Sequence, residues 1–523
     1  MKLFGRNIEL KVSGTKETEI KEYNNYPYSY PSKYTGLPIP FDGEKTPYEL
    51  GTPIDEFPDY YSLRVRSWSA FLRSDIVQNV IRKYILWVVG QGLKIQYDPV
   101  NLVLNEQGVN LSDEYTENIE TKFRLFCNSK NSTYNKLTNL HVLASEALKN
   151  AIISGDVLII LRYNKSLTVE LIDGVFIQTP IGSNYETEAN KKGNIIFQGV
   201  EINKKGEHIA YYIADDNGGY NRILSRGSRT GRLQAWLMYG LKYKLNDTRG
   251  MSLLTAVIET ANKMDRYKDA TLNAAEENSN VIYSIKHGAN STGENPMVKE
   301  FVQSMGKNKG TAPETKTDCE QVASKIAQKT KGMAYNLPVD SEIDRTAYNV
   351  DPNYKSFYEV NIDLVYATLG IAPEVALDRF GGSYSSSRAA LKGWEYKLMV
   401  DRKNIMSEEF YKPIFNYWFD INVFNQKIDA PGYLEFYQNK DDLLIEAYLN
   451  SRFIGRGVPH IDPSKEVNAI RSKLGKIFEN VPLETLDQAT EELNTGDFST
   501  IIKKTNNEKN LASDFINNQS ENS

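Results

Sequence analysis

The sequence predicts an α+β fold that is predominantly helical, and three observations support this prediction. Apolar residues recur at three- and four-residue steps over several long stretches, which is the pattern of amphipathic helices. Short runs rich in β-branched and aromatic residues, separated by turn residues, lie between residues 157 and 214 and indicate strands. The chain has 523 residues, several times the usual domain length of ~150 residues, so we expect several packed units.

Composition narrows the class of protein. Hydrophobic residues make up 40% of the chain and charged residues 25%, which excludes a wholly disordered or collagen-like chain. The formal net charge of -5 argues against a generic nucleic-acid coat protein, which would be strongly basic. Cys127 and Cys319 stand far apart, so neither a disulfide framework nor a cysteine zinc site is indicated. No apolar run is long enough for a secretory signal or a membrane span, so we expect no membrane partner.

Residues 1–61 are predicted to form an extended arm. The string YNNYPYSYPSKYTGLPIP, which starts at Tyr23, is crowded with tyrosine and proline and has no helical or strand period. Proline fixes φ and removes an N–H donor, so a helix is excluded, while the tyrosine rings need a surface on which to lie. Two interpretations stay open, an arm docked on a neighbouring molecule and a flexible tail.

Residues 62–246 are predicted to form one mixed α+β domain. An apolar stripe from Leu63 to Val89 predicts a helix that ends at Gly90, and a second helix is expected over residues 138–154. The segments that follow are predicted to be strands separated by turns, namely VLIILRY, LTVELID, NIIFQGVEI and HIAYYIA.

Residues 247–280 are predicted to hold one long helix, and residues 352–370 a second. The apolar face of the first would carry Leu254, Val257, Ile258, Ala261, Met264, Leu272 and Ala275. Between the two helices, residues 281–351 are predicted to be a small inserted module in which VIYSIKHG and KGMAYNLPVD are strands. Two helices that flank a small module indicate an antiparallel stalk with a tip.

Residues 371–388 contain a break rich in glycine and serine, LDRFGGSYSSSR. The longest apolar stripe of the chain follows and predicts a long helix over residues 389–432, with Trp394, Leu398 and Phe410 on one face. A kink or break is expected at Pro413, because proline lacks the N–H and clashes with the carbonyl four residues earlier. The two remaining segments are a helical region and a flexible polar tail, residues 433–495 and 496–523.

The sequence contains no recognisable catalytic or metal site. It has no Gly-x-x-x-x-Gly-Lys-Ser/Thr phosphate loop and no His-Glu-x-x-His, and the string GGSYS at 381–385 lacks the last glycine of a serine-hydrolase elbow. The four histidines are scattered. Adjacent acids such as Asp441 and Asp442 would point about 100° apart on a helix and would not converge on a metal ion. We therefore expect no catalytic residues, no metal and no cofactor, and a protein that is not an enzyme.

Five stretches, in order and with matching spacing, resemble the lambda-type portal protein family of tailed bacteriophages, the head-to-tail connector. Each string alone is weak, but the ordered set between about residues 60 and 475 is specific. The arm, residues 288–330 and the tail past 495 match nothing in that family, which leaves the choice of partners open. The strings are FLRSDIVQNVIRKYILWVVGQGLKIQ, NIIFQGVEINKKGEHIAYYI, TRGMSLLTAVIETANKMDRYKDATLNAA, LGIAPEVALDRFGGSYSSSRAALKGWEYKL with EFYKPIFNYWF, and HIDPSKEVNAIRSKLG.

The resemblance implies a portal fold with wing, stem, clip and crown regions. It also implies a homo-oligomeric ring, commonly of twelve copies, that serves as the channel for genome packaging and ejection. The implied partners are double-stranded DNA passing through the channel, the major capsid protein, the terminase and the head-tail adaptor protein. The implied location is the portal vertex of the virion, after assembly in the host bacterial cytoplasm. The regions would be the wing at 62–246 and 389–432, the stem at 247–280 and 352–370, the clip at 281–351 and the crown at 433–495.

By the same resemblance, residues 371–388 are similar to the tunnel loop that projects toward DNA. Glycine permits backbone shapes closed to other residues, and small serine hydroxyls can touch phosphates without holding them. An ordinary connection in which a serine caps the next helix would have the same sequence, and either arginine could bridge to a neighbouring subunit, so these interpretations stay open. The expected DNA-facing residues are Arg379, Gly381, Gly382, Ser383, Tyr384, Ser385, Ser386 and Arg388. The expected contacts for terminase or adaptor are Lys286, His287, Lys307 and Lys309 in the clip.

Two other functional classes are weighed against the portal. One is another structural protein of the virion, of the baseplate or scaffold type, and the other is a nucleic-acid enzyme with an unrecognised site. A closed ring with an axial hole would separate the portal from both.

Overall fold

The computed structural model describes most of the chain between residues 60 and 457. The described stretches are 60–181, 191–215, 218–228, 230–242, 247–279, 354–377 and 384–457, with the pairs 2–3, 6–7, 284–285 and 335–336 and some single positions. Most of the predicted arm, clip and tail therefore lies outside the described residues. Two short strands of the arm, β1 (Lys2–Leu3) and β2 (Arg6–Asn7), pair antiparallel.

The chain divides into two compact units. Unit 1 comprises residues 1–69, 85–255 and 398–523, and unit 2 comprises residues 70–84 and 256–397. Three helices cross a boundary between the units, namely α1 (Tyr60–Arg73), α2 (Asp75–Val88) and α12 (Tyr384–Asp401).

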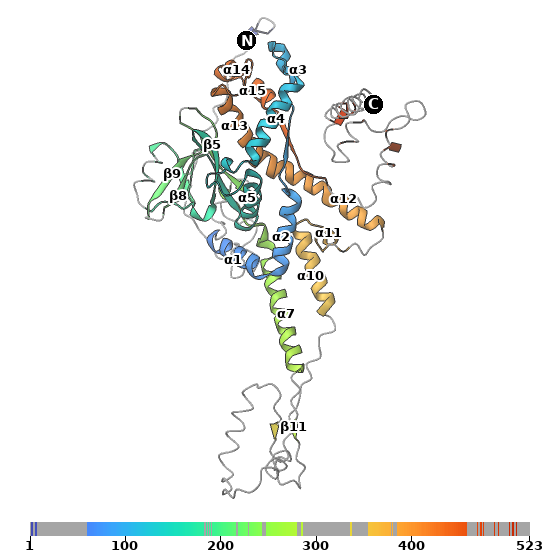
Figure 1. Ribbon diagram of the computed structural model, residues 1–523. Coiled ribbons are helices and arrows are strands. Elements are labelled where there is room, and N and C mark those ends of the chain that lie inside the picture. Colours follow the sequence, from blue (N-terminus) through green and yellow to red (C-terminus); the bar gives the residue numbers. More distant parts are fainter. Residues whose placement is uncertain are drawn as a thin grey trace, which may run out of the picture. The chain divides into compact units, whose positions relative to one another are not determined.

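Two antiparallel sheets form the centre of unit 1 (Figure 1). The three-stranded sheet has the order β10–β4–β5 and the four-stranded sheet the order β6–β7–β8–β9. The strands of the first sheet are β4 (Asp156–Asn164), β5 (Ser166–Asp173) and β10 (Ala235–Tyr239). Those of the second are β6 (Ile195–Phe197), β7 (Val200–Ile202), β8 (His208–Ala214) and β9 (Tyr220–Leu224).

Three of the four predicted strands are confirmed, and the fourth is corrected. The string NIIFQGVEI forms two strands, β6 and β7, in which Phe197 pairs with Val200. The two residues between them, Gln198 and Gly199, both have positive φ. Such a pair makes a tight two-residue hairpin turn, which explains why one apolar run folds back on itself.

The core of unit 1 joins the two sheets. Residues from β4, β7, β8 and β10, together with Ile177, form one buried cluster, which comprises Leu158, Ile160, Ile177, Val200, Tyr211, Ile213, Ala235 and Leu237. Helix α5 (Leu140–Ser154) packs against β4, β5 and β10. It begins where the Asn139 side chain accepts a hydrogen bond from the Val142 backbone, a usual N-terminal cap.

A second part of unit 1 holds a two-stranded sheet and several helices. Strands β3 (Lys94–Tyr97) and β13 (Ser451–Ile454) pair antiparallel, which adds one short strand to the region predicted to be helical over residues 433–495. The edge of β3 gains a partner in this way. The helices are α3 (Asn101–Leu104), α4 (Asp113–Asn128), α13 (Lys412–Phe424), α14 (Tyr433–Asn439) and α15 (Asp442–Leu449), with short 3-10 turns at Asn105–Gln107, Lys130–Ser132 and Gly174–Phe176.

Aromatic rings fill the space between these elements. Phe415 of α13 lies 5.1 Å from the ring of Phe123 on α4 and 5.8 Å from that of Tyr97 on β3. Tyr433 of α14 lies 5.0 Å from Tyr448 of α15. Aromatic pairs of this geometry add about 0.5 to 1.5 kcal/mol each beyond the area they bury.

The long helix predicted over residues 389–432 is irregular before its proline and not at it. Helix α12 begins at Tyr384 and is followed by the π-helix η5 (Arg402–Tyr411) and then by α13, which ends at Phe424. A π-helix pairs each carbonyl with the N–H five residues later, as the Lys412 N–H does with the Ser407 carbonyl. Pro413 has no N–H to offer the Glu409 carbonyl, which accepts instead from the Trp236 Nε1 at 2.7 Å.

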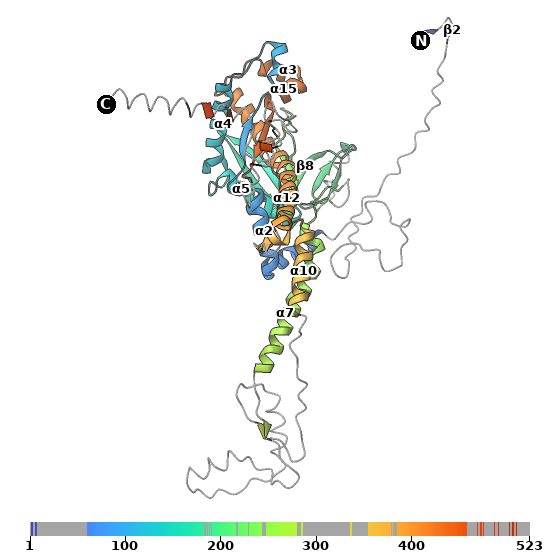
Figure 2. The same cartoon turned by 90° about the vertical axis from the view of Figure 1, so that its right-hand side faces the viewer.

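Unit 2 is built around α7 (Ile258–Ser279) and α10 (Tyr354–Thr368), which lie side by side in both views (Figures 1 and 2). Its other elements are the 3-10 turn Leu253–Ala256, which overlaps the boundary, the strands β11 (Ser284–Ile285) and β12 (Tyr335–Asn336), which pair parallel, and α11 (Pro373–Leu377). Trp394 of α12 is buried against Tyr84 of α2, with ring centroids 6.2 Å apart.

The single helix predicted from Leu63 to Val89 is two helices. Helix α1 ends at Arg73 and α2 begins at Asp75, with Ser74 between them. Serine followed by an acidic residue is a typical start of a helix, and the Ser74 carbonyl accepts from the Gln78 N–H in the first turn of α2. The apolar stripe runs through both helices, so periodicity alone did not reveal the break.

Candidate functional site

The predicted tunnel-loop residues are only partly loop. Helix α11 ends at Leu377 and α12 begins at Tyr384, so Tyr384, Ser385, Ser386 and Arg388 are helical. The break is shorter than predicted because the serine run starts the helix instead of extending the loop. Gly381, Gly382 and Ser383 lie outside the described residues.

The side chains of this region differ in their access to solvent. Arg379 and Ser386 are exposed and Arg388 is half-buried. Ser387, which lies between Ser386 and Arg388 but outside the expected set, is buried. The structure therefore leaves Arg379 and Ser386 as the accessible described residues of the predicted DNA-facing set.

The predicted clip contacts cannot be placed. Lys286, His287, Lys307 and Lys309 all lie outside the described residues. Only β11 and β12 are described in this module.

An aromatic cluster joins α7 to α10. Tyr267 of α7 stacks on Tyr354 at 5.4 Å between ring centroids and meets Phe357 edge-on at 4.8 Å. Tyr358 stacks on Tyr354 at 5.7 Å, one turn along α10. These contacts hold the two helices as a pair.

The same helix pair leaves apolar surface uncovered. Ile362, Val365 and Tyr366 are buried on one face of α10, while Phe357, Val360 and Leu364 are exposed on another. Val360 exposes 66% of its surface. Leu272, predicted on the apolar face of α7, is also exposed, because no described element covers the second half of that helix. Apolar residues spaced three and four apart on an exposed helix face indicate a surface that another chain covers.

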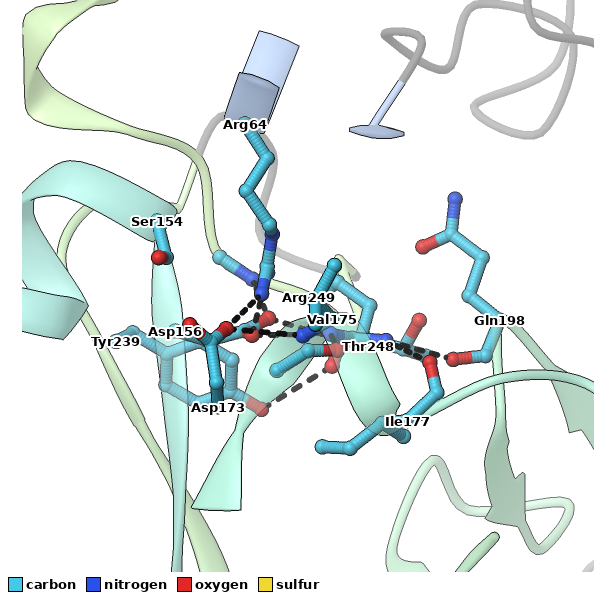
Figure 3. A network of polar contacts seen from close by, with 12 residues as sticks. Arg64, Ser154, Asp156, Asp173, Val175, Ile177, Gln198, Tyr239, Thr248 and Arg249 are labelled. Carbon is cyan, nitrogen blue, oxygen red and sulfur yellow. Dashed lines mark hydrogen bonds and ion pairs between the residues drawn. The ribbon is translucent and has the colours of Figure 1, made fainter. Parts of the chain in front are cut away.

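A buried network of charged side chains lies in unit 1, around Asp156 at the start of β4 (Figure 3). The Arg64 Nη2 of α1 donates to Asp156 Oδ1 at 2.7 Å, and the Arg249 Nε donates to Asp156 Oδ2 at 2.8 Å. The Gly250 backbone N–H also donates to Oδ2, at 3.0 Å. All three charged side chains are buried, so each charge depends on its partners within the protein.

Arg249 extends the network to three backbone carbonyls. Its guanidinium donates to the carbonyls of Gly174, Ile177 and Gln198 at 2.6, 3.1 and 2.8 Å. Arg64 reaches a second acid, Asp173 of β5, at 3.0 Å. The network thus ties α1, β4, β5 and the β6–β7 turn to the segment around Arg249, shortly before the chain leaves unit 1 at Thr255.

Two glycines let the backbone close beside this network. Gly155 has φ +100, and a Cβ on Gly155 or on Gly250 would collide with the carbonyl oxygen of the other. No pattern in the sequence linked Arg64 and Arg249 to Asp156. The one signal was a carboxylate and an arginine at the ends of otherwise apolar stretches, DVLIIL and TRGMSLL.

The two histidines among the described residues, His141 and His208, each lie beside a tyrosine hydroxyl. The His208 Nδ1 lies 3.1 Å from the Tyr211 hydroxyl, and burial lowers the pKa of His208 to about 4. The His141 Nδ1 lies 3.0 Å from the Tyr411 hydroxyl, and burial lowers its pKa as well. Among the described residues, no group of three or more His, Cys, Asp or Glu is placed to hold a metal ion. In the same part of the chain, no helix combines the length and apolar character needed to cross a membrane.

Comparisons with known proteins give a family match and several similar solved structures. A family model described as phage portal protein, lambda family, matches residues 51–399. No curated protein matches the chain. Among solved structures, a chain from the neck of the native GTA particle, computed with C12 symmetry, shows 11% identity and a TM-score of 0.40, covering 83% of this chain and 93% of that chain.

Two further solved structures come from the same kind of particle. A chain from the virion of the native gene transfer agent (GTA) particle shows 8% identity and a TM-score of 0.36, covering 84% of this chain and 94% of that chain. A chain from the neck of the empty GTA particle, computed with C6 symmetry, shows 10% identity and a TM-score of 0.37, with the same coverage. The assignment rests on the family model, which spans well over half of the chain.

The family match favours a portal over the two other classes, another structural protein of the virion and a nucleic-acid enzyme. A phage portal protein is a structural component of the virion and not an enzyme. The resemblance to this family is confirmed by the match over residues 51–399, while the strings EFYKPIFNYWF and HIDPSKEVNAIRSKLG lie beyond the matched residues. The chain belongs to the lambda family of phage portal proteins.

Proposed function

We propose that the chain forms a closed ring at one vertex of a capsid and that double-stranded DNA passes through this ring during packaging and ejection. The major capsid protein would surround the ring, the terminase would dock on it during packaging, and the head-tail adaptor would bind it afterwards. The proposal rests on the family assignment together with one observation, the uncovered apolar face of α10.

A ring provides a cover for that face. A closed cyclic assembly joins one patch of each subunit to a different patch of the next, so an exposed helix face can be buried by a neighbour without leaving a free end. Phe357, Val360 and Leu364 lie at positions i, i+3 and i+7 of α10 and form one such patch.

The mass of the purified full-length protein tests the ring. Twelve copies of the 59.4 kDa chain would weigh about 710 kDa, and eleven or thirteen copies would still form a ring of this kind. Mass photometry measures this mass, and negative-stain images should show an axial hole. A stable monomer or a two-fold dimer at all salt and protein concentrations would refute the proposal.

Substitutions on α10 test the interface itself. Val360→Asp with Leu364→Asp should abolish the ring, because two carboxylates would have to lose their water inside the interface. The monomer should keep its circular dichroism spectrum, since both side chains are exposed in it. Lys355→Glu, on the same helix but outside the stripe, is the matched control and should leave the ring intact. Rings of unchanged mass in the double variant would show that another surface holds the subunits together.

The residues between α11 and α12, together with the start of α12, are proposed to face the DNA. The set is the predicted one, Arg379, Gly381, Gly382, Ser383, Tyr384, Ser385, Ser386 and Arg388, and the exposure of Arg379 and Ser386 supports it for these two. Arg379→Glu should lower the amount of DNA per head at least threefold and leave the ring mass unchanged, because the new carboxylate repels phosphates. Heads filled to the normal level by this variant would exclude a DNA-facing role for Arg379.

Lys286, His287, Lys307 and Lys309 are proposed to contact terminase or adaptor. Three of them carry positive charge and would attract an acidic partner surface. Reversing the charge of the three lysines should weaken terminase binding in low salt while rings still form. Equal binding by this variant would move the contact elsewhere.

A further inference from the structure

An exposed surface of unit 1 combines positive charge with large apolar side chains. It covers the last turns of α4, the loop over residues 129–139 and the first turn of α5 (Figure 2). We call it the basic apolar surface. Its exposed apolar residues are Leu125, Tyr134, Leu137 and Val142, and its exposed cations are Lys122, Arg124, Lys130 and Lys136.

The loop within this surface is held in place by its own hydrogen bonds. The Thr133 hydroxyl donates to the Thr138 carbonyl at 2.8 Å, and the Tyr134 N–H donates to the Val169 carbonyl of β5 at 2.9 Å. The Asn135 side chain accepts from the Leu137 N–H at 3.1 Å. Leu137, 71% exposed, is therefore presented to solvent by a fixed backbone.

The stretch of chain that forms the surface contains no acidic residue. No Asp or Glu occurs between residues 121 and 145, although the whole chain is acidic. Glu170 lies on β5, near the Thr133–Val169 bridge, but pairs with Arg162, whose guanidinium lies 5.1 Å from the centre of the Tyr134 ring. An occupant of this surface must be acidic and must also offer apolar side chains.

The chain contains a segment of that chemistry. Residues 482–498, PLETLDQATEELNTGDF, hold five acids and no Lys or Arg, and Leu483, Leu486 and Leu493 recur at helical spacing. Leu486 is helical and 48% exposed. Residues 458–481 connect this segment to the end of the described body at residue 457. We propose that residues 482–498 dock on the basic apolar surface.

The apolar residues distinguish this occupant from a nucleic acid. Phosphates would use the four cations but would leave Leu125, Leu137 and Val142 in water. An acidic segment with leucines on one face covers both kinds of group. The contact would fasten the C-terminal part of the chain to the part that carries the two sheets, either within one subunit or between two.

Disulfide trapping in the full-length protein tests the contact. Leu137→Cys is combined with Leu486→Cys in a Cys319→Ser background, in which Cys127 is buried. Mild oxidation should cross-link this pair at least tenfold more than the matched control pair, Leu102→Cys with Leu486→Cys. Leu102 on α3 is at least as exposed as Leu137 but lies outside the surface. Cross-linking within one chain and cross-linking between two copies, separated by their mass on a denaturing gel, both support the proposal.

Charge reversal tests the chemistry of the same contact. Lys130→Glu with Lys136→Glu should reduce the cross-link severalfold, and adding Glu491→Lys with Glu492→Lys should restore it. A yield equal to that of the control pair, or a yield unaffected by charge reversal, overturns the proposal. Binding of a short DNA duplex that is lost in Lys130→Glu with Lys136→Glu, in the absence of cross-linking, would assign the surface to nucleic acid and also overturn it.

Discussion

The Asp156 network of unit 1 and the α7–α10 pair of unit 2 differ in which side chains they expose to solvent. Around Asp156 three charged side chains are removed from solvent and bonded to one another and to the backbone. On α10, by contrast, three large apolar side chains face solvent. The first region is complete within one chain, whereas the second gains stability only when something covers it.

This contrast separates two sources of stability. Buried ion networks add little net energy when intact but are costly to break, because each remaining charge is left without water. An exposed apolar stripe adds nothing to the monomer and contributes about 25 cal/mol for each Å² that a neighbour removes from water. Substitutions around Asp156 should therefore act on folding, and those on the α10 stripe should act on assembly.

The largest effect is expected at Asp156. Asp156→Ala would leave two buried guanidinium groups without their shared carboxylate and the Gly250 N–H without its acceptor, which together should cost ~5 kcal/mol or more. We expect little folded protein, or a large fall in the midpoint of urea unfolding. Asp173→Ala is the control, since this acid is partly exposed and pairs with Arg64, so its loss should be milder. A stable Asp156→Ala variant would mean that water enters the network.

The next effect is expected at Trp394, which is 2% exposed in unit 2. Trp394→Ala should cost about 3 to 5 kcal/mol, because a large aromatic side chain leaves a cavity beside Tyr84. Within the described residues its indole N–H has no acceptor, so Trp394→Phe should cost much less. Thermal melting of the two variants measures the difference. Equal losses of stability in the two variants would show that the indole N–H has a partner. No loss of stability in either variant would show that the apolar stripe around Trp394 is not part of a core.

Local patterns in the sequence predicted much of the fold but little of the site. Helices α5, α7 and α10 and strands β4, β5 and β8 follow from periodicity and from turn residues close by in the chain. Arg64 and Arg249 lie 92 and 93 residues from Asp156, and no local pattern links them. The β3–β13 pairing joins residues that lie still farther apart in the sequence, and each of its strands is only four residues long.

At Pro413 the physical argument was correct but did not predict the local structure. Loss of the N–H at Pro413 was foreseen, but its local consequence depends on neighbours that no pattern near it reveals. The Trp236 Nε1, from β10, donates to the Glu409 carbonyl at 2.7 Å, which is the carbonyl that an α-helix would pair with residue 413. The DNA-facing and clip residues rest on the resemblance to the family and stay predictions.

A smaller effect is expected from that tryptophan. Trp236→Phe keeps the ring but removes the donor to Glu409, which should cost about 1 to 3 kcal/mol. The Glu409 carbonyl would lose this partner and η5 would be held less firmly. The backbone N–H groups of η5 should therefore exchange faster. Trp68→Phe, which removes the 2.8 Å bond to the Ser154 hydroxyl, is a control that leaves η5 protected. If exchange in η5 stayed slow in Trp236→Phe, the π-helix would be held by its backbone alone.

The smallest effect is expected from an ion pair on the surface of unit 2. The Lys268 Nζ of α7 lies 2.8 Å from Asp75 Oδ2 of α2, and this hydrogen bond raises the pKa of Lys268. Both side chains are about half exposed or more, so water and salt screen the attraction. A double-mutant cycle of Lys268→Met and Asp75→Asn should give a coupling of about 0.2 to 1 kcal/mol at low salt.

The cycle is best measured in the Val360→Asp, Leu364→Asp background, where we expect monomers, so that assembly cannot bury the pair. The coupling should fall further in 1 M salt, where the screening length is about 3 Å. A coupling above 2 kcal/mol that survives 1 M salt would mean that the pair is shielded from solvent even within one chain. In that case the Lys268–Asp75 pair would stabilise the contact of α7 with α2 as a buried ion pair does. Unit 2 would then not differ from the Asp156 network in the way described above. A weak, salt-sensitive coupling leaves the aromatic contacts of Tyr267 and the cover supplied by a neighbour as the interactions that hold α7 and α10 in place.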